Sequence, residues 1–231
     1  MRRAIVAFVL AAATGGCGLI SSDVTETPFD LPQRMYSFDS STFPVPGGVT
    51  SEVPCGAGQL VVDCCNPPAP LPAPDCTTTP LSCEQNENGM NVCTATVTVS
   101  QSQMINFGQE VSQLSGLAGF VEIKIKRISY VVTNNTLNID LPDVALYLAP
   151  QGTTSPSDSS ARKFGTMPAI PAMTMPAGDV VLEPDAGQTL KAFTQDITQP
   201  ISFIAATTVR VTHSPAGRID LTITGKLATS L

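Results

Sequence analysis

Hydrophobic and polar residues alternate along much of the second half of the chain, and this pattern predicts β-strands. From residue 93 to residue 99, hydrophobic residues alternate with three threonines, a period of two that is typical of a strand with one buried face. The alternation returns at residues 144–148 and 209–223. We therefore expect a mainly β protein, an antiparallel β-sandwich of about seven to nine strands with one or two short helices.

The most regular alternation lies between residues 121 and 141. Hydrophobic residues occupy the odd positions from Val121 to Ile125 and the even positions from Ile128 to Val132. A shift of one residue would turn the later side chains to the opposite face of the sheet. We therefore expect a β-bulge near Lys126-Arg127, which would keep both groups on the buried face.

Two turn sequences in this half of the chain predict β-hairpins. Asn134-Asn135 is a candidate two-residue turn, because asparagine tolerates the positive φ that such turns require. It would pair the preceding strand with residues 137–141. Pro215-Ala216-Gly217 fits a three-residue turn, which would place Val211 opposite Leu221 in the same sheet.

Two short segments carry helix signals. Residues 106–118 place hydrophobic side chains on one helical face, and Asn106 and Gln109 have the spacing of a capping box. A second helix is expected to begin at Asp185, a favoured N-cap residue, and to end before Pro200.

The N-terminus has the layout of an export signal. Met1-Arg2-Arg3 is cationic, and the eleven residues from Ala4 to Thr14 are uncharged and mostly hydrophobic. A transmembrane helix needs roughly 20 hydrophobic residues, so this stretch is typical of a signal peptide instead. Cleavage after Ala13 by an ordinary signal peptidase would release a soluble protein.

A second candidate cleavage site follows directly. Thr14-Gly15-Gly16-Cys17 resembles the lipobox of bacterial lipoproteins, although Thr14 stands where that family usually has an aliphatic residue. The resemblance is confined to this N-terminal segment. It implies that Cys17 becomes the first mature residue and carries diacylglycerol and palmitate, and that Gly18 directs the protein to the outer membrane.

The cysteine count supports lipidation. The chain has seven cysteines, and an odd number in an exported protein requires an explanation for the unpaired one. An anchor at Cys17 supplies it and leaves six disulfide candidates: Cys55, Cys64, Cys65, Cys76, Cys83 and Cys93. The adjacent Cys64 and Cys65 should bond to different partners, because a bond between neighbours is strained. No Cys-x-x-Cys pair is present, so zinc is the less favoured alternative.

These observations divide the chain into segments. Residues 66–74 are rich in proline and predict an extended stretch inside the cysteine-containing region. The expected order is a signal peptide at 1–16, a lipid anchor and tether at 17–34, a disulfide-stapled, proline-rich segment with short strands at 35–93, and the β-sandwich domain at 94–231.

Charge limits the class of partner. Charged residues make up 13 % of the chain and the net charge is −7, which argues against a nucleic-acid binder, since such a protein needs a basic surface. Removal of residues 1–16 takes away two arginines and no acidic residue, so the mature chain carries a net charge of −9. Membrane association would therefore depend on the lipid anchor and not on a basic face.

Candidate chemistry is sparse. His213 is the single histidine and no Gly-x-Ser-x-Gly segment is present, so catalysis by a Ser-His-Asp triad is poorly supported. Met167, Met173 and Met175 are candidate Cu(I) ligands, because thioether sulfur suits that soft ion. The favoured interpretation is that these methionines pack an irregular loop against a sheet.

Two further features of the sequence bear on metal binding and on the fold. Asp140 and Asp143 could offer oxygen ligands to calcium, but the spacing of a calcium-binding loop is missing. The strand at residues 121–133 and the C-terminal hairpin resemble the LEA14/water-stress β-sandwich domains, with Asn134-Asn135-Thr136 in place of that family's Asn-Pro-Asn signature. This second resemblance implies a fold and no activity.

The sequence favours a non-catalytic lipoprotein of the bacterial cell envelope that needs no cofactor. Its β domain would bind an envelope protein or contribute to envelope structure. The alternative is a periplasmic carrier that holds an apolar ligand between its two sheets, which would require a continuous cavity of roughly 300–1,000 Å³.

Overall fold

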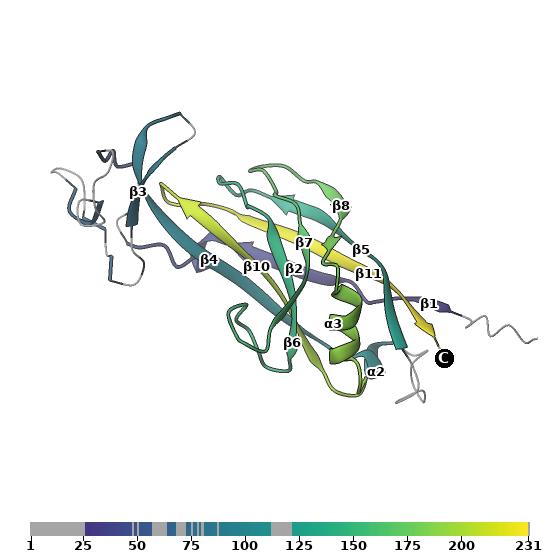
Figure 1. Cartoon of the computed structure of the whole chain (residues 1–231). Helices are drawn as coiled ribbons and strands as arrows, with labels where there is room; N and C mark the ends of the chain where they lie inside the picture. The colour runs from purple at the N-terminus through teal and green to yellow at the C-terminus, as the bar shows by residue number, and fades with distance from the viewer. Residues whose placement is uncertain are drawn as a thin grey trace, which may run out of the picture.

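Two antiparallel sheets pack face to face in the computed structural model (Figure 1). The structure describes residues 26–47, 49, 51–56, 64–67, 73–74, 76–77, 79, 81–86, 88–111 and 122–230. The predicted fold class, a mainly β antiparallel sandwich with few helices, is confirmed. A sandwich suits this sequence because strands with alternating hydrophobic residues bury one face each against the other sheet.

Within the described residues, the first sheet has five strands. They are β1 (Thr27–Asp30), β2 (Arg34–Asp39), β5 (Glu122–Asn135), β8 (Ala177–Asp179) and β11 (Arg218–Ser230). Strand β11 lies at the centre, with β5 on one side and with β1 and β2 in succession on the other. The N-terminal strands therefore belong to the same sheet as the C-terminus.

The second sheet has six strands within the described residues, in the order β3-β4-β10-β6-β7-β9. Their bounds are β3 (Leu81–Gln85), β4 (Asn91–Ile105), β10 (Ile201–Val211), β6 (Val144–Pro150), β7 (Arg162–Met167) and β9 (Val181–Leu182). The helices whose bounds lie within the described residues are η1 (Ser40–Thr42), α2 (Phe107–Glu110) and α3 (Ala186–Phe193). Strand β4 contains the predicted alternation of residues 93–99, and β6 contains that of residues 144–148.

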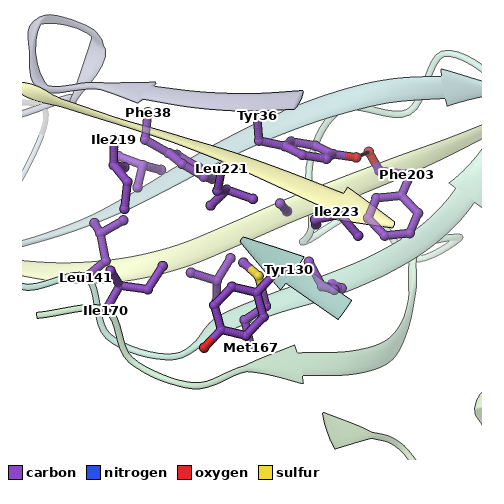
Figure 2. Packing of buried hydrophobic residues seen from close by; sticks show 14 of the residues in the cluster. Tyr36, Phe38, Tyr130, Leu141, Met167, Ile170, Phe203, Ile219, Leu221 and Ile223 are labelled. Atoms are coloured by element: carbon purple, nitrogen blue, oxygen red, sulfur yellow. Dashed lines mark hydrogen bonds between the residues drawn. The ribbon is translucent and has the colours of Figure 1, made fainter. Parts of the chain in front are cut away.

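Aromatic and branched side chains from both sheets fill the space between them (Figure 2). The ring of Tyr36 on β2 lies 6.0 Å from the ring of Phe203 on β10, which in turn lies 5.1 Å from that of Phe164 on β7. Burial raises the pKa of the Tyr36 hydroxyl, which donates to the Phe203 carbonyl oxygen. This contact joins the two sheets directly.

The predicted β-bulge is confirmed. Lys226 of β11 pairs with Arg127 of β5, and the next residue, Leu227, pairs with Ile125. Lys126 is therefore the extra residue in β5. The bulge keeps Ile123 and Ile128 buried on the same side of the sheet although their parity differs.

The predicted hairpin at Asn134-Asn135 is wrong. Strand β5 pairs with β11, so Tyr130 lies opposite Ile223 and not opposite Ile139. The side chain of Asn135 donates to the carbonyl oxygens of Pro171 and Thr174, at 3.0 and 2.8 Å. These bonds hold Asn135 against the segment between β7 and β8. The chain then continues to β6 and does not turn back to pair with β5.

The predicted C-terminal hairpin is also wrong. Strands β10 and β11 belong to different sheets, so Val211 pairs with Ala95 while Leu221 pairs with Tyr36 and Val132. Both side chains are fully buried, as the alternation predicted, but they contribute to the core from opposite sheets. The sequence pattern identified the buried face of each strand and not its neighbour.

Both predicted helices form, and both are short. Asn106 caps α2 as expected, since its side chain accepts from the backbone N–H of Gln109 at 3.1 Å. Helix α2 ends after one turn, at Glu110, and most of the predicted extension to residue 118 lies outside the described residues. Helix α3 begins after Asp185, whose side chain makes no capping hydrogen bond, and ends at Phe193.

Strands of the two sheets also occur in segments that were expected to precede the β-sandwich domain. Residues 27–30 form β1, although the tether was expected to reach residue 34. Strand β2, placed in the cysteine-rich segment, supplies the core residues Tyr36 and Phe38, and β4 crosses the expected boundary at residues 93 and 94. The signal peptide at 1–16 and Cys17 lie outside the described residues.

Candidate functional site

Three disulfides staple the segment that precedes β4, and two of them tie it to the strands β3 and β4. They join Cys55 to Cys83, Cys64 to Cys93, and Cys65 to Cys76. The adjacent cysteines therefore have different partners, as predicted. All six cysteines after Cys17 are paired, which leaves Cys17 without a cysteine partner in its own chain.

Two of these disulfides lie side by side. The sulfur atoms of Cys55, Cys64 and Cys93 lie within 4.8 Å of one another, because Cys83 and Cys93 face each other across β3 and β4. A metal site would need thiolates, and each of these sulfurs already forms a disulfide. The cluster is therefore a structural brace at one end of the second sheet.

Next to this brace lies a hollow of about 530 Å³, which we call the polar groove. Its walls come from β3, the end of β10 and the segment that follows β5. Its charged residues and its histidine are Glu52, Glu84, Asp140, Arg210 and His213. Its amide side chains are Gln85, Asn86, Asn88 and Asn138.

The sheet register places the two central charges of the groove. Glu84 lies opposite Val92 on β4 and Arg210 lies opposite Thr96, so both side chains project from the same face, on either side of β4. Arg210 Nη1 lies 3.5 Å from Glu84 Oε2. The Arg210 side chain is 73 % exposed, so this ion pair contributes little to stability and leaves its groups accessible to a partner.

His213 lies at the edge of the groove without a catalytic arrangement among the described residues. Its Nδ1 atom lies 3.3 Å from the hydroxyl of Thr212, which contacts Glu52 Oε1 at 3.4 Å. A hydroxyl between histidine and carboxylate cannot orient the imidazole as a buried aspartate does in a triad.

Asp140 has a structural role in the groove wall, since its Oδ1 atom accepts from the backbone N–H of Ala172 at 2.6 Å. Asp143 lines a different hollow, on the outer face of β6 and β10. Within the part of the chain that the structure describes, no cluster of three acidic or histidine side chains brings these two residues together.

Asn86, in the wall of the polar groove, has an unsatisfied hydrogen-bond donor. Its Oδ1 atom accepts from the backbone N–H groups of Asn88 and Met90, both at 3.0 Å. Its buried Nδ2 atom has no hydrogen-bond partner among the described residues. A buried donor without a hydrogen-bond partner costs free energy.

The candidate Cu(I) ligands are separated by their environments. Met167 is completely buried in the core, whereas Met173 and Met175 are more than 60 % exposed. Packing against a sheet therefore describes Met167 and not Met173 or Met175. The structure does not bring the three sulfur atoms into one site.

Among the described residues, the core side chains of the sandwich enclose a small cavity. Phe107, Phe164 and Phe203, with aliphatic neighbours, enclose an apolar cavity of about 20 Å³. An apolar ligand needs a space of roughly 300 Å³ or more, so the observed core does not support the carrier alternative.

Sequence reasoning singled out His213 and Asp140 but missed Glu52, Glu84 and Arg210. The alternation around β10 does show that Arg210 points outward between Val209 and Val211. No local pattern could indicate that Glu84 lies beside it, because the contact depends on the order β3-β4-β10.

Comparison with known proteins gives little further information. No known protein family matches the chain, and no characterised protein is similar to it in sequence. A solved structure described as a carbohydrate-binding module of the β-sandwich superfamily aligns with a TM-score of 0.27 and 8 % identity. The alignment covers 87 % of this chain and 56 % of that chain. Among the described residues, no helix is both long enough and apolar enough to cross a membrane.

Proposed function

We propose that the protein is a non-catalytic lipoprotein of the bacterial outer membrane, anchored through Cys17. Its β-sandwich would present the polar groove to a basic segment of an envelope protein. The observation that carries the anchor is the complete pairing of the other six cysteines. Disulfides form in oxidising compartments outside the cytoplasm, and the unpaired Cys17 follows directly after a signal-peptide sequence.

The charge of the groove supports a basic partner. Glu52, Glu84 and Asp140 contribute three carboxylates, against one guanidinium from Arg210. The mature chain also carries a net charge of −9. A basic segment would be attracted by this field.

The absence of enzymatic activity is part of the proposal. His213 hydrogen-bonds to a hydroxyl and to no carboxylate among the described residues, and Arg210 and Glu84 form an exposed ion pair that remains accessible to a partner. The groups in the groove are suited to hydrogen bonding and ion pairing, and the hydroxyl of Thr212 next to His213 belongs to no Ser-His-Asp arrangement among the described residues.

The anchor is tested by mass spectrometry of the mature protein without reduction, together with membrane fractionation. We expect a chain that begins at Cys17, carries acyl groups and retains three disulfides. Cys17→Ser should leave the membrane fraction, while Ser22→Ala, a control outside the lipobox, should remain there. A Cys17→Ser protein that stays in the membrane would contradict the anchor.

The groove is tested by site-specific photocrosslinking in intact cells. A photoreactive residue at Asn88, in the groove, should capture an envelope protein, whereas one at Ser157, on a distant loop, should not. Glu52→Lys should abolish the crosslink from Asn88, and Asp158→Lys, the same charge change outside the groove, should preserve it. Equal capture from both positions would exclude the groove as the binding surface.

A further inference from the structure

Strand β4 has a long free edge. It spans fifteen residues, Asn91–Ile105, but β3 pairs with residues 91–95 only. Strand β10 pairs with residues 95–105 from the other side. Among the described residues, the outer edge of β4 from Thr96 to Met104 therefore has no strand partner, and Figure 1 shows β4 along the border of the sheet.

The other sheet edges within the described residues are protected in the usual ways. Strand β1 has four residues and contains Pro28, and β2 has six residues with Arg34 and Asp39 at its ends. Strand β3 carries Glu84, β8 has three residues that include Asp179, and β9 has only two. Short length, proline and charge all prevent edge-to-edge association.

The free edge of β4 has none of these protections. Residues 96–104 have the sequence TVTVSQSQM, without a charge, proline or glycine. Thr96, Thr98 and Ser100 are exposed, and Met104 is 58 % exposed. An unprotected edge of this length presents a row of backbone donors and acceptors that another strand can pair with.

We propose that this edge pairs with β4 of a second copy of the chain, in an antiparallel arrangement about a two-fold axis at Ser100. Thr98 would then face Ser102 of the other copy, and Val99 would face Gln101. The hydroxyls of Thr98 and Thr208 already lie 3.2 Å apart on this face, so the pairing extends an existing row of hydroxyl groups across the interface.

A second copy is a suitable partner for this edge because the strand carries no charge. The chain as a whole is acidic and its net charge opposes association, so two copies repel each other least where the strands that meet carry no charge. The two-fold axis brings the same uncharged strand against itself and joins two six-stranded sheets into one. A two-fold interface of this kind is closed, so it yields a dimer and not a fibre.

Sedimentation equilibrium of the detergent-solubilised mature protein tests the proposal. We expect a dimer. Ser100→Lys would bring two ammonium groups together at the axis and should raise the dimer Kd at least about tenfold. Ser157→Lys, the same charge change on an exposed loop, should leave the dimer unchanged. Circular dichroism should show that both variants remain folded, because both side chains are exposed.

A second measurement tests the register. A short bis-maleimide should crosslink Ser100→Cys to itself, and should not crosslink Thr208→Cys, which lies on the same face one strand inward. The native cysteines after Cys17 are all in disulfides and do not react. A monomeric wild-type protein at roughly 100 μM, or a dimer that Ser100→Lys leaves intact, would overturn the proposal.

Discussion

Ser37 of β2 donates its hydroxyl to Oδ1 of Asp220 on the neighbouring strand β11, over 2.7 Å. The other carboxylate oxygen, Oδ2, lies 3.2 Å from Asn134 Nδ2 and 2.9 Å from Arg218 Nη2. Burial alone would raise the pKa of Asp220, but these donors and the Arg218 charge outweigh it and hold the pKa below its ordinary value of 3.8. The ionised carboxylate therefore holds three strands of the first sheet together.

This arrangement predicts a pH dependence of stability. Because the pKa is lower in the folded state, the contribution of Asp220 is fully present above pH 3.8 and is lost as the pH falls through the folded value. Asp220→Asn should reduce the free energy of unfolding by about 1.5–3 kcal/mol at pH 7. Urea unfolding at a series of pH values should show the difference from wild type shrinking below pH 3.8. A difference that is constant down to pH 2 would contradict a role for the charge.

Gly217 is predicted to be intolerant of substitution. Its φ is +94°, and an added Cβ would lie 2.0 Å from the carbonyl oxygen of Thr136. Gly217→Ala should therefore destabilise the protein by more than about 2 kcal/mol, since it combines backbone strain with a clash against backbone. Gly152→Ala is the matched control, because Gly152 has a φ of +87° but open space around it. It should cost about 1 kcal/mol in thermal or urea unfolding, and equal losses would show that the clash is relieved.

The sequence specified which face of each strand is buried but not which strands are neighbours. The shift in parity at Lys126 depends only on residues within β5, so the bulge was predictable. The partner of Tyr130 depends on competition between residues 137–141 and β11, two stretches with the same alternation. Strand β11 offers a longer register, from Ile219 to Ser230, and local turn propensity at Asn134-Asn135 did not outweigh it.

The polar groove was not predictable for a related reason. Arg210 and Glu84 come from strands that are not adjacent in the sequence, and their contact passes over β4. Periodicity gives the outward direction of each side chain and says nothing about strand order. The cysteines were more informative, because their number alone implied three bridges and one remaining residue, Cys17.

Asn135 is predicted to be essential for the path that the chain takes after β5. Its side chain is buried, accepts from Leu137 N–H at 3.1 Å and donates to two carbonyl groups. Asn135→Ala leaves these groups unsatisfied and should destabilise the protein by roughly 2–4 kcal/mol. Asn134→Ala should have a smaller effect in the same urea unfolding experiment, because Asn134 has a more exposed side chain. A larger loss for Asn134→Ala would contradict this assignment.

The three disulfides should contribute unequally to stability. Cys64–Cys93 joins residues 29 apart, whereas Cys65–Cys76 joins residues 11 apart. The longer loop restricts the unfolded chain more, by about 0.9 kcal/mol in loop-closure entropy. Replacement of Cys64 and Cys93 by alanine should cost roughly 2–5 kcal/mol, and replacement of Cys65 and Cys76 should cost less, both measured by urea unfolding without reductant. Because Cys93 belongs to β4 and Cys64 is completely buried, loss of packing adds to the entropic term for the longer loop. A larger loss of stability on replacement of Cys65 and Cys76 would contradict the argument from loop length and packing.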